Sequence, residues 1–195
     1  MTKLLFTKVY NSENTYLSII ERKNSIFSVV VKRIYIFFTR FRAARLNNDR
    51  YVISRYYLIR LTQKLGIYNK FNYCFSHSGR YSAVIFSSEI EHISVDIEPL
   101  GRRIPESLRL EIRSLYPDLK IAELMVILIL ESLVKLSIFK PPVNFLKGLA
   151  DMESVKINEL KNSVFEINVN NVKVYSKIYT FLDLYICITL ESSQF

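Results

Sequence analysis

The sequence FNYCFSHSGRYSAVIFSSEIEHISVDIE (residues 71–98) contains three apolar runs separated by short polar segments. The runs at 71–75, 81–87 and 93–97 are rich in β-branched and aromatic residues, a composition typical of strands. Polar residues at 76–79 separate the first two runs. Those at 88–91 predict a hairpin turn, from which the run at 93–97 would return as the partner strand.

Upstream of these runs, the sequence predicts strands at 4–10 and 26–31 and a helix at 32–45, where arginines and aromatic residues interleave. A second helix is expected at 48–65. It would begin at an asparagine, a favoured N-cap residue, and Gly66 follows it at the position of a helix-ending glycine.

Downstream, prolines predict where two further helices lie, at 105–115 and 119–138. Three more runs have strand composition, at 163–168, 172–179 and 184–190. This order of elements predicts an α+β protein with two similar sub-domains rather than a regular series of βαβ units. The length of 195 residues suits one mid-sized domain.

The net charge of +9 is unevenly distributed along the chain. Residues 1–70 hold 14 basic and three acidic residues, a net charge of +11, whereas residues 71–195 carry −2. Such a basic segment attracts polyanions, which include nucleic acid, a membrane surface, a phosphorylated cofactor and an acidic protein.

The two cysteines, Cys74 and Cys187, form neither a disulfide framework nor a metal-ligand spacing, so we expect a cytoplasmic protein. The N-terminus lacks the apolar run of a signal peptide. The longest apolar run, at 124–130, is much shorter than the roughly 20 residues that span a bilayer, and no membrane span is expected.

Asp96 and Glu98 form the first candidate site. Because side chains alternate along a strand, both carboxylates would lie on one face at the end of the run at 93–97. Two adjacent carboxylates raise each other's pKa unless a cation offsets them, and a divalent ion with oxygen ligands would do so. The alternative is that both side chains face solvent at a strand end.

Glu131 and Lys135 form the second candidate site, four residues apart on one face of the most apolar predicted helix. An ordinary helix ion pair is the alternative, although charges within a buried helix usually have a role. His77 is expected at a turn, where a histidine is commonly solvated. A Ser-His-Asp hydrolase is disfavoured because the sequence lacks a G-x-S-x-G elbow.

Three motifs occur in a specific order: F-S-H-S-G at 75–79, V-D-I-E at 95–98 and E-S-x-x-K at 131–135. In this order they resemble the 4′-phosphopantetheinyl transferase superfamily, in particular its compact, two-lobed surfactin/enterobactin-type members. R-Y-V-I-S-R at 50–55 is similar to a further segment of that family. The resemblance extends over about residues 48–190.

The resemblance implies a Mg²⁺-dependent transfer of 4′-phosphopantetheine from coenzyme A to a serine of an acyl or peptidyl carrier protein. Asp96, Glu98 and Glu131 would be the metal ligands, and Glu131 would also help to deprotonate the acceptor serine. Lys135 would contact the diphosphate of coenzyme A and offset the charge of the leaving group, adenosine 3′,5′-bisphosphate.

For coenzyme A, the resemblance implies that Arg50 and His77 hold the 3′-phosphate and that Ser76 lies beside the nucleotide. The implied fold is a pseudo-twofold pair of α+β lobes, 1–98 and 99–195, with the cofactor between them. We expect a monomer whose partners are coenzyme A and an acidic carrier protein. Neither nucleic acid nor a membrane is an expected partner. The basic N-terminal segment would suit both of these anionic partners.

Two other functions remain open from the sequence. The interleaved arginines and tyrosines between Arg33 and Arg60 are also typical of a nucleic-acid-binding module. The second open function is that of a catalytically silent relative, which binds coenzyme A or a carrier without transferring the group. It is motivated by Leu130 and Ile127, which replace a lysine and a tryptophan of the family motif, and by the absence of a G-K-P segment before residue 71.

Overall fold

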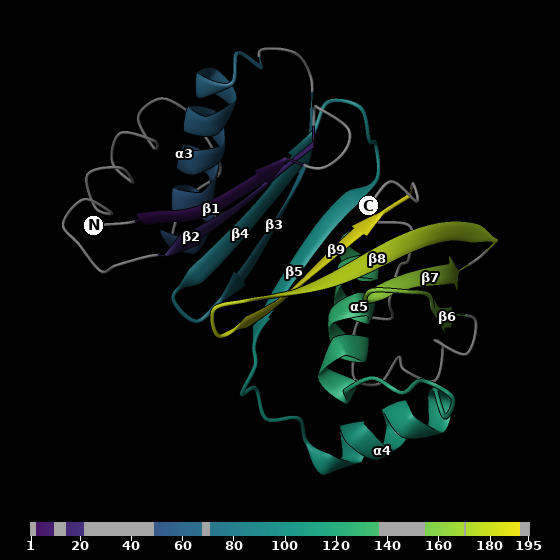
Figure 1. Ribbon diagram of the computed structural model, residues 1–195. Coiled ribbons are helices and arrows are strands. Elements are labelled where there is room, and N and C mark those ends of the chain that lie inside the picture. The colour runs from purple at the N-terminus through teal and green to yellow at the C-terminus, as the bar shows by residue number, and fades with distance from the viewer. Residues whose placement is uncertain are drawn as a thin grey trace.

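A computed structural model describes residues 3–9, 15–21, 49–67, 71–136, 155–169 and 171–191 (Figure 1). Within these residues the protein is α+β, as predicted, with two antiparallel sheets. The four-stranded sheet has the order β1 (Lys3–Val9), β2 (Thr15–Glu21), β4 (Tyr81–Ser87) and β3 (Asn72–Ser78). The five-stranded sheet has the order β5 (Ile93–Pro99), β9 (Leu184–Leu190), β8 (Val172–Phe181), β7 (Val164–Val169) and β6 (Lys156–Glu159).

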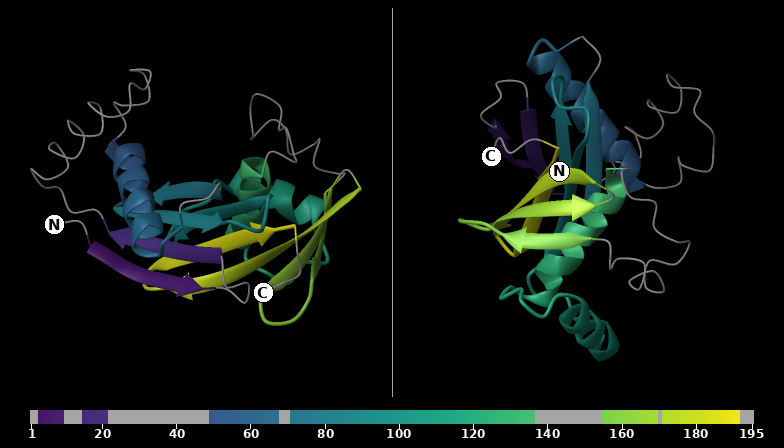
Figure 2. Two further views of the ribbon diagram at one scale, coloured as in Figure 1. Left: turned by 90° about the horizontal axis from the view of Figure 1, so that it is seen from above. Right: turned by 90° about the vertical axis from the view of Figure 1, so that its right-hand side faces the viewer.

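Three helices are described: α3 (Asp49–Lys64), α4 (Glu106–Leu115) and α5 (Glu123–Lys135). Helix α3 packs on the four-stranded sheet, and α5 packs on β5 and β9 of the five-stranded sheet (Figures 1 and 2). The two sheets bury a shared apolar layer between them. None of the described helices has the length and apolar character that crossing a bilayer requires.

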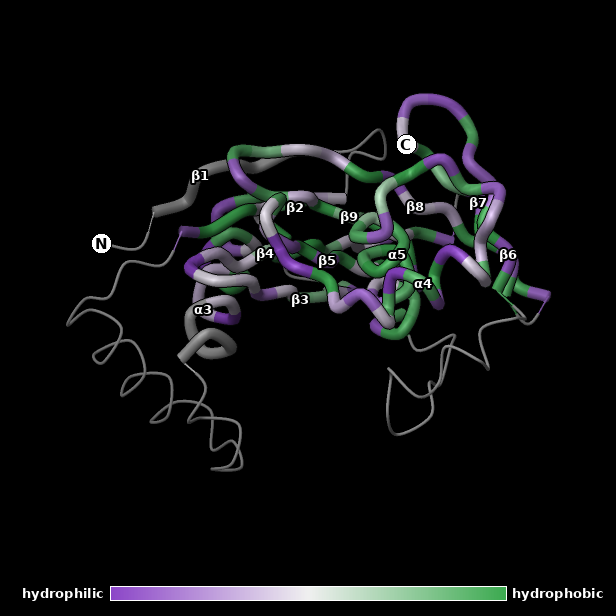
Figure 3. Tube along the Cα trace, turned by 90° about the horizontal axis from the view of Figure 1, so that it is seen from below, coloured by the Kyte–Doolittle hydropathy of each residue, from purple (hydrophilic) through white to green (hydrophobic). Residues whose placement is uncertain are grey.

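Alternation along the strands builds these layers. On β5 the apolar side chains of Ile93, Val95 and Ile97 face the four-stranded sheet, where they meet residues such as Ala83 and Ile85 of β4. The alternate residues of β5 face α5, and all three are polar: Ser94, Asp96 and Glu98. The tube in Figure 3 is mainly hydrophobic along α5, so these polar groups lie within an apolar layer.

The predicted hairpin between residues 81–87 and 93–97 is wrong. Strand β5 pairs with β9, with Asp96 opposite Cys187, and belongs to the other sheet. The reason is that β4 already pairs with β2 on one side and β3 on the other, so neither of its edges is open to β5. The division expected at 98/99 thus falls inside a strand whose partner comes from the C-terminal part of the chain.

The position predicted for His77 is also wrong. Strand β3 continues through Ser78, so His77 lies within the strand and the turn is formed by Gly79, with a φ of +51°, and Arg80. By contrast, α3 ends where predicted: Gly66 has a φ of +69°, and the N–H of Ile67 donates to the carbonyl of Thr62 at 2.9 Å.

Other differences concern elements rather than the site. Strands β2 and β6 were not predicted, and α5 begins at Glu123 rather than at residue 119. The strand predicted at 26–31 and the helix predicted at 32–45 lie outside the described residues. The remaining predicted strands agree with the structure to within two residues at each end, except that β3 ends three residues later than predicted.

Candidate metal centre

The three predicted carboxylates meet between β5 and α5. Asp96 and Glu98 project from one face of β5, and Glu131 projects from α5, which packs on that face. One oxygen of each carboxylate lies within 4.8 Å of an oxygen of the other two. Asp96 is buried, and Glu98 and Glu131 are half-buried. Residues 35 positions apart in the sequence thus form one acidic cluster, which we call the acidic trio.

Strand β3 lies beside β5 and provides two hydroxyl donors to the acidic trio. Ser76 Oγ donates to Asp96 Oδ1 at 2.5 Å and accepts the N–H of Ile97 at 3.2 Å. Ser78 Oγ donates to Glu98 Oε2 at 3.1 Å. Ser78 was missed by sequence reasoning, although its spacing of two from Ser76 in the S-H-S motif places both side chains on one face of the strand.

Two cations flank the acidic trio. Lys135 Nζ forms an ion pair with Asp96 Oδ1 and lies 3.3 Å from the carbonyl oxygen of Val95. Arg102 forms an ion pair with Glu98, and its Nη1 lies 3.6 Å from Glu131 Oε1. Arg102 was not predicted, because it follows β5 in a segment without a motif. Three carboxylates and two cations leave a formal charge of −1 when all are ionised.

Burial raises the pKa of two carboxyls of the acidic trio. It raises the pKa of Glu131 to about 8, and the neighbouring carboxylate of Asp96 adds to the effect. Burial likewise raises the pKa of Glu98, an effect that the nearby Arg102 opposes. At neutral pH these shifts favour the protonated form of Glu131, and a cation bound by the acidic trio would instead favour its ionised form.

The acidic trio fits a hard divalent cation such as Mg²⁺. Its side chains offer only oxygen ligands, which Mg²⁺ prefers. Asp96 Oδ2 is buried, and no hydrogen-bond donor among the described residues reaches it. A buried carboxylate oxygen without a donor is costly unless a cation balances it.

The residues expected to bind the nucleotide are only partly brought to this site. Ser76 lies against Asp96, as described above. His77 projects from the opposite face of β3, where its Nδ1 lies 2.9 Å from Ser82 Oγ, so it does not contact the acidic trio. Arg50 lies in the first turn of α3, and its side chain is outside the described residues.

A fully buried group of hydroxyls lies beneath the acidic trio. Ser132 Oγ lies 2.5 Å from Thr189 Oγ1, which lies 2.5 Å from Ser176 Oγ, and Ser94 Oγ donates to the carbonyl of Ser132 at 2.9 Å. These four residues, here called the hydroxyl cluster, join α5 to β5, β8 and β9. They fix the backbone next to Glu131. Sequence reasoning missed them, since hydroxyls scattered through apolar runs give no local signal.

Beyond Lys135, a hollow of about 340 Å³ opens beside the end of α5. Phe71, just before β3, and Tyr73, within β3, line it together with Glu91 and His92 before β5. Because Lys135 both lines this hollow and contacts Asp96, the hollow adjoins the acidic trio. It offers space for the part of a ligand that extends away from a group bound at the carboxylates.

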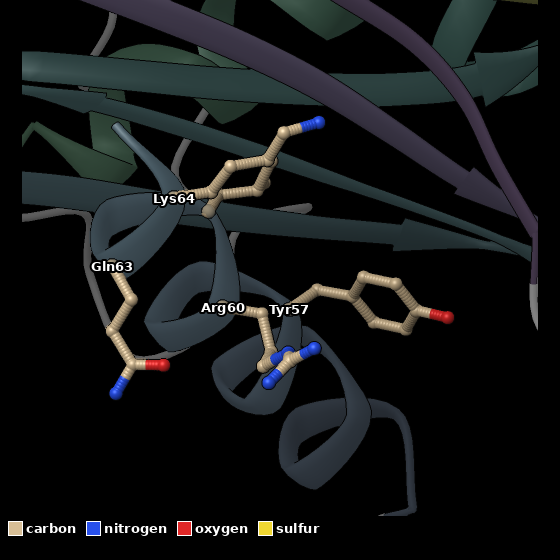
Figure 4. Close-up of a pocket in the computed structure, with 5 residues that line it drawn as sticks. Tyr57, Arg60, Gln63 and Lys64 are labelled. Atoms are coloured by element: carbon tan, nitrogen blue, oxygen red, sulfur yellow. The ribbon is translucent and has the colours of Figure 1, made fainter. Parts of the chain in front are cut away.

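A separate hollow of about 440 Å³ lies on α3 (Figure 4). Its lining includes Tyr57, Arg60, Gln63 and Lys64, and Figure 4 shows that these side chains point in different directions from one helix. None of them contacts the acidic trio through an ion pair or hydrogen bond that the described structure contains. Arg60 and Lys64 add positive charge to this part of the surface, but the lining side chains do not converge on one point.

No model of a known protein family matches the chain, and no curated protein sequence matches it either. The chemistry of the site therefore has to be inferred from the residues themselves. Three carboxylate oxygens can hold a divalent cation, and Lys135 and Arg102 add positive charge beside them. Such a set of groups is suited to binding a phosphate ester or a diphosphate.

Proposed function

We propose that this protein is a Mg²⁺-dependent 4′-phosphopantetheinyl transferase that modifies a serine of an acidic acyl or peptidyl carrier protein. The observation that carries the proposal is the acidic trio with Lys135 at its side. The F-S-H-S-G, V-D-I-E and E-S-x-x-K motifs contribute Ser76 and Ser78, Asp96 and Glu98, and Glu131 and Lys135 to the same place.

In this proposal Asp96, Glu98 and Glu131 hold the metal ion. A bound Mg²⁺ would neutralise charge on the diphosphate of coenzyme A and polarise the phosphorus that is attacked. Lys135, 30% exposed beside Asp96, supplies a positive charge to the bridging oxygen that leaves. Ser76 and Ser78 orient the carboxylates of Asp96 and Glu98 through their hydroxyl hydrogen bonds.

The reaction proposed is a substitution at the phosphorus that carries the pantetheine group. The serine oxygen of the carrier forms a new P–O bond, and the P–O bond to adenosine 3′,5′-bisphosphate breaks. Glu131 accepts the serine proton, directly or through a water molecule, and the leaving group keeps the electron pair of the broken bond. The products are holo-carrier protein and adenosine 3′,5′-bisphosphate.

The fold proposed is the two-lobed fold of that superfamily. Two antiparallel sheets, each with its own helix packed on the outer face, support this assignment. The basic residues on α3 suit an anionic partner, either the phosphates of coenzyme A or the acidic surface of a carrier.

The test is mass spectrometry of apo-carrier domains incubated with the protein and coenzyme A, with Mg²⁺ or with EDTA. We expect one carrier to gain the mass of a phosphopantetheine group with Mg²⁺ only. Asp96→Asn should abolish the gain, whereas Asp118→Asn, a change at an exposed turn residue, should leave it intact. If fatty-acid, polyketide and siderophore carriers all stay unmodified, the proposed activity is wrong.

The same samples test the two alternatives. The hollow on α3 with Arg60 and Lys64 favours nucleic-acid binding as the second candidate. Salt-sensitive RNA or DNA binding that survives Asp96→Asn, and that coenzyme A does not compete away, would support it. Binding of coenzyme A without transfer would support a catalytically silent relative, for which the buried Leu130 in place of a lysine is the motivation.

A further inference from the structure

Arg102 closes the outer side of the acidic trio. After β5 ends at Pro99, the chain turns, with the N–H of Arg102 donating to the Pro99 carbonyl at 3.0 Å. From this turn the guanidinium reaches Glu98 and Glu131, one carboxylate from the strand and one from the helix. The two carboxylates that Arg102 contacts, Glu98 and Glu131, have side chains that are 16% and 26% exposed, whereas Asp96, the carboxylate that Lys135 contacts, is 4% exposed.

The two cations of the site are therefore not equivalent. Lys135 contacts the buried carboxylate of Asp96 and a backbone carbonyl. Arg102 contacts the two half-buried carboxylates from the solvent side. A divalent cation bound by all three carboxylates would be attracted by the same negative charges with which the guanidinium now pairs, so that cation and Arg102 compete for Glu98 and Glu131.

We propose that Arg102 exchanges partners when the site is loaded. It bridges Glu98 and Glu131 while no divalent cation is present, and it binds an anionic diphosphate after a cation has taken those carboxylates. This inference rests on the proposed function, since it assumes that the acidic trio holds the metal. Arg102 would be a substrate-binding residue for the diphosphate, a role that no motif in the sequence indicates.

Charge and geometry both support the exchange. With a divalent cation bound, the five charged side chains and the ion sum to +1, which favours an anion at the mouth of the site. A guanidinium presents a planar pair of donors that matches two phosphate oxygens. Residues 102–105 belong to neither helix nor strand, so the side chain can turn without breaking a β-ladder.

The first experiment measures the affinity of the full chain for Mn²⁺, a paramagnetic substitute for Mg²⁺, from the free-ion signal in electron paramagnetic resonance. Arg102→Gln removes the competing cation, and we expect it to tighten Mn²⁺ binding about three- to tenfold. Arg103→Gln is the matched control, because Arg103 is exposed and has no ion pair in the described part of the chain. It should bind Mn²⁺ like the wild type.

The second experiment measures binding of inorganic diphosphate, added as its preformed Mg²⁺ complex, by calorimetry. Arg102→Gln should weaken this binding about tenfold. Arg102→Lys should weaken it less, since lysine keeps the positive charge but lacks the planar pair of N–H donors of a guanidinium. Unchanged diphosphate affinity in Arg102→Gln overturns the inference, as does unchanged or weaker Mn²⁺ binding. If the wild type and Arg102→Gln both fail to bind Mn²⁺, the proposed function fails together with the inference, so the two failures are distinguishable.

Discussion

Two polar clusters lie on the face of β5 that α5 covers, and they are built in opposite ways. The hydroxyl cluster is fully buried, and each of its hydroxyls has a hydrogen-bond partner. The acidic trio is only partly buried, and one oxygen of Asp96 has no donor among the described residues. Ser94 and Asp96, two residues apart on one strand, thus belong to a satisfied cluster and an unsatisfied one.

The difference follows from what each group can do. A hydroxyl both donates and accepts, so serines and threonine can complete a network among themselves. Ionised carboxylates only accept, so the acidic trio depends on serine hydroxyls and on Lys135 and Arg102. Without a further cation, the raised pKa of Glu131 favours a proton on that carboxyl at neutral pH. The hydroxyl cluster therefore stabilises the fold, whereas the acidic trio costs stability until a cation binds.

The largest expected effect is on cation binding. Asp96→Asn removes the buried charge at the centre of the acidic trio, and we expect Mn²⁺ affinity to fall at least about 100-fold. The free energy of unfolding of the metal-free protein should fall far less than the affinity does, because like-charge repulsion is relieved. Isothermal titration and urea unfolding measure the two quantities, and Asp118→Asn should change neither. Equal Mn²⁺ affinity in Asp96→Asn would remove the acidic trio as the metal site.

The hydroxyl cluster should respond in the opposite way. Thr189→Val keeps the shape of the side chain but leaves Ser176 Oγ buried with its partner removed. We expect the free energy of unfolding to fall by about 1–3 kcal/mol. Mn²⁺ affinity should stay close to that of the wild type, because no carboxylate is touched.

The control for this variant is Thr180→Val, since Thr180 is an exposed threonine of β8. It should leave the stability within experimental error. A large loss of Mn²⁺ affinity in a folded Thr189→Val protein would contradict this division of roles, since it would show that the hydroxyl cluster also supports metal binding by the acidic trio.

The sequence predicted the local features of this arrangement but not its long-range pairing. The alternation of Asp96 and Glu98, the helical spacing of Glu131 and Lys135, and the ending of α3 at Gly66 all depend on near neighbours. The pairing of β5 with β9 does not. It depends on which edges remain open once β2, β3 and β4 have paired.

The candidate site shows the same limit. Local spacing paired Asp96 with Glu98 and Glu131 with Lys135, because each pair belongs to one strand or helix, and only the family resemblance implied that the two pairs share a site. Arg102 and the hydroxyl cluster could not be predicted, since their contacts depend on a turn after β5 and on four elements that meet. His77 was predicted wrongly because the polar residues 76–78 suggest a turn, whereas in the structure two of them face β5.

The pH dependence of stability separates the clusters further. Glu131 has a folded pKa of about 8 against an ordinary value of 4.5, so its contribution to stability is full below about pH 4.5 and is lost as the pH rises through 8. In EDTA, we expect the free energy of unfolding to fall by up to about 4 kcal/mol between pH 5 and pH 8.5. Glu131→Gln should show a clearly smaller decrease, and Thr189→Val should keep the wild-type slope. The same slope in Glu131→Gln as in the wild type would show that the carboxyl of Glu131 is not the titrating group.

The smallest expected effect concerns Ser78, whose hydroxyl orients Glu98 from β3. Ser78→Ala leaves the charge of the acidic trio unchanged and removes one hydrogen bond, which is worth about 0.5–1.5 kcal/mol. We expect Mn²⁺ affinity to fall two- to tenfold at most, with Ser88→Ala, at an exposed serine beyond β4, as the control. Because Arg102 also holds Glu98, the loss should be larger in the Arg102→Gln background, where the serine is the remaining described donor to this carboxylate. Equal losses in the two backgrounds would mean that Ser78 and Arg102 act on Glu98 independently.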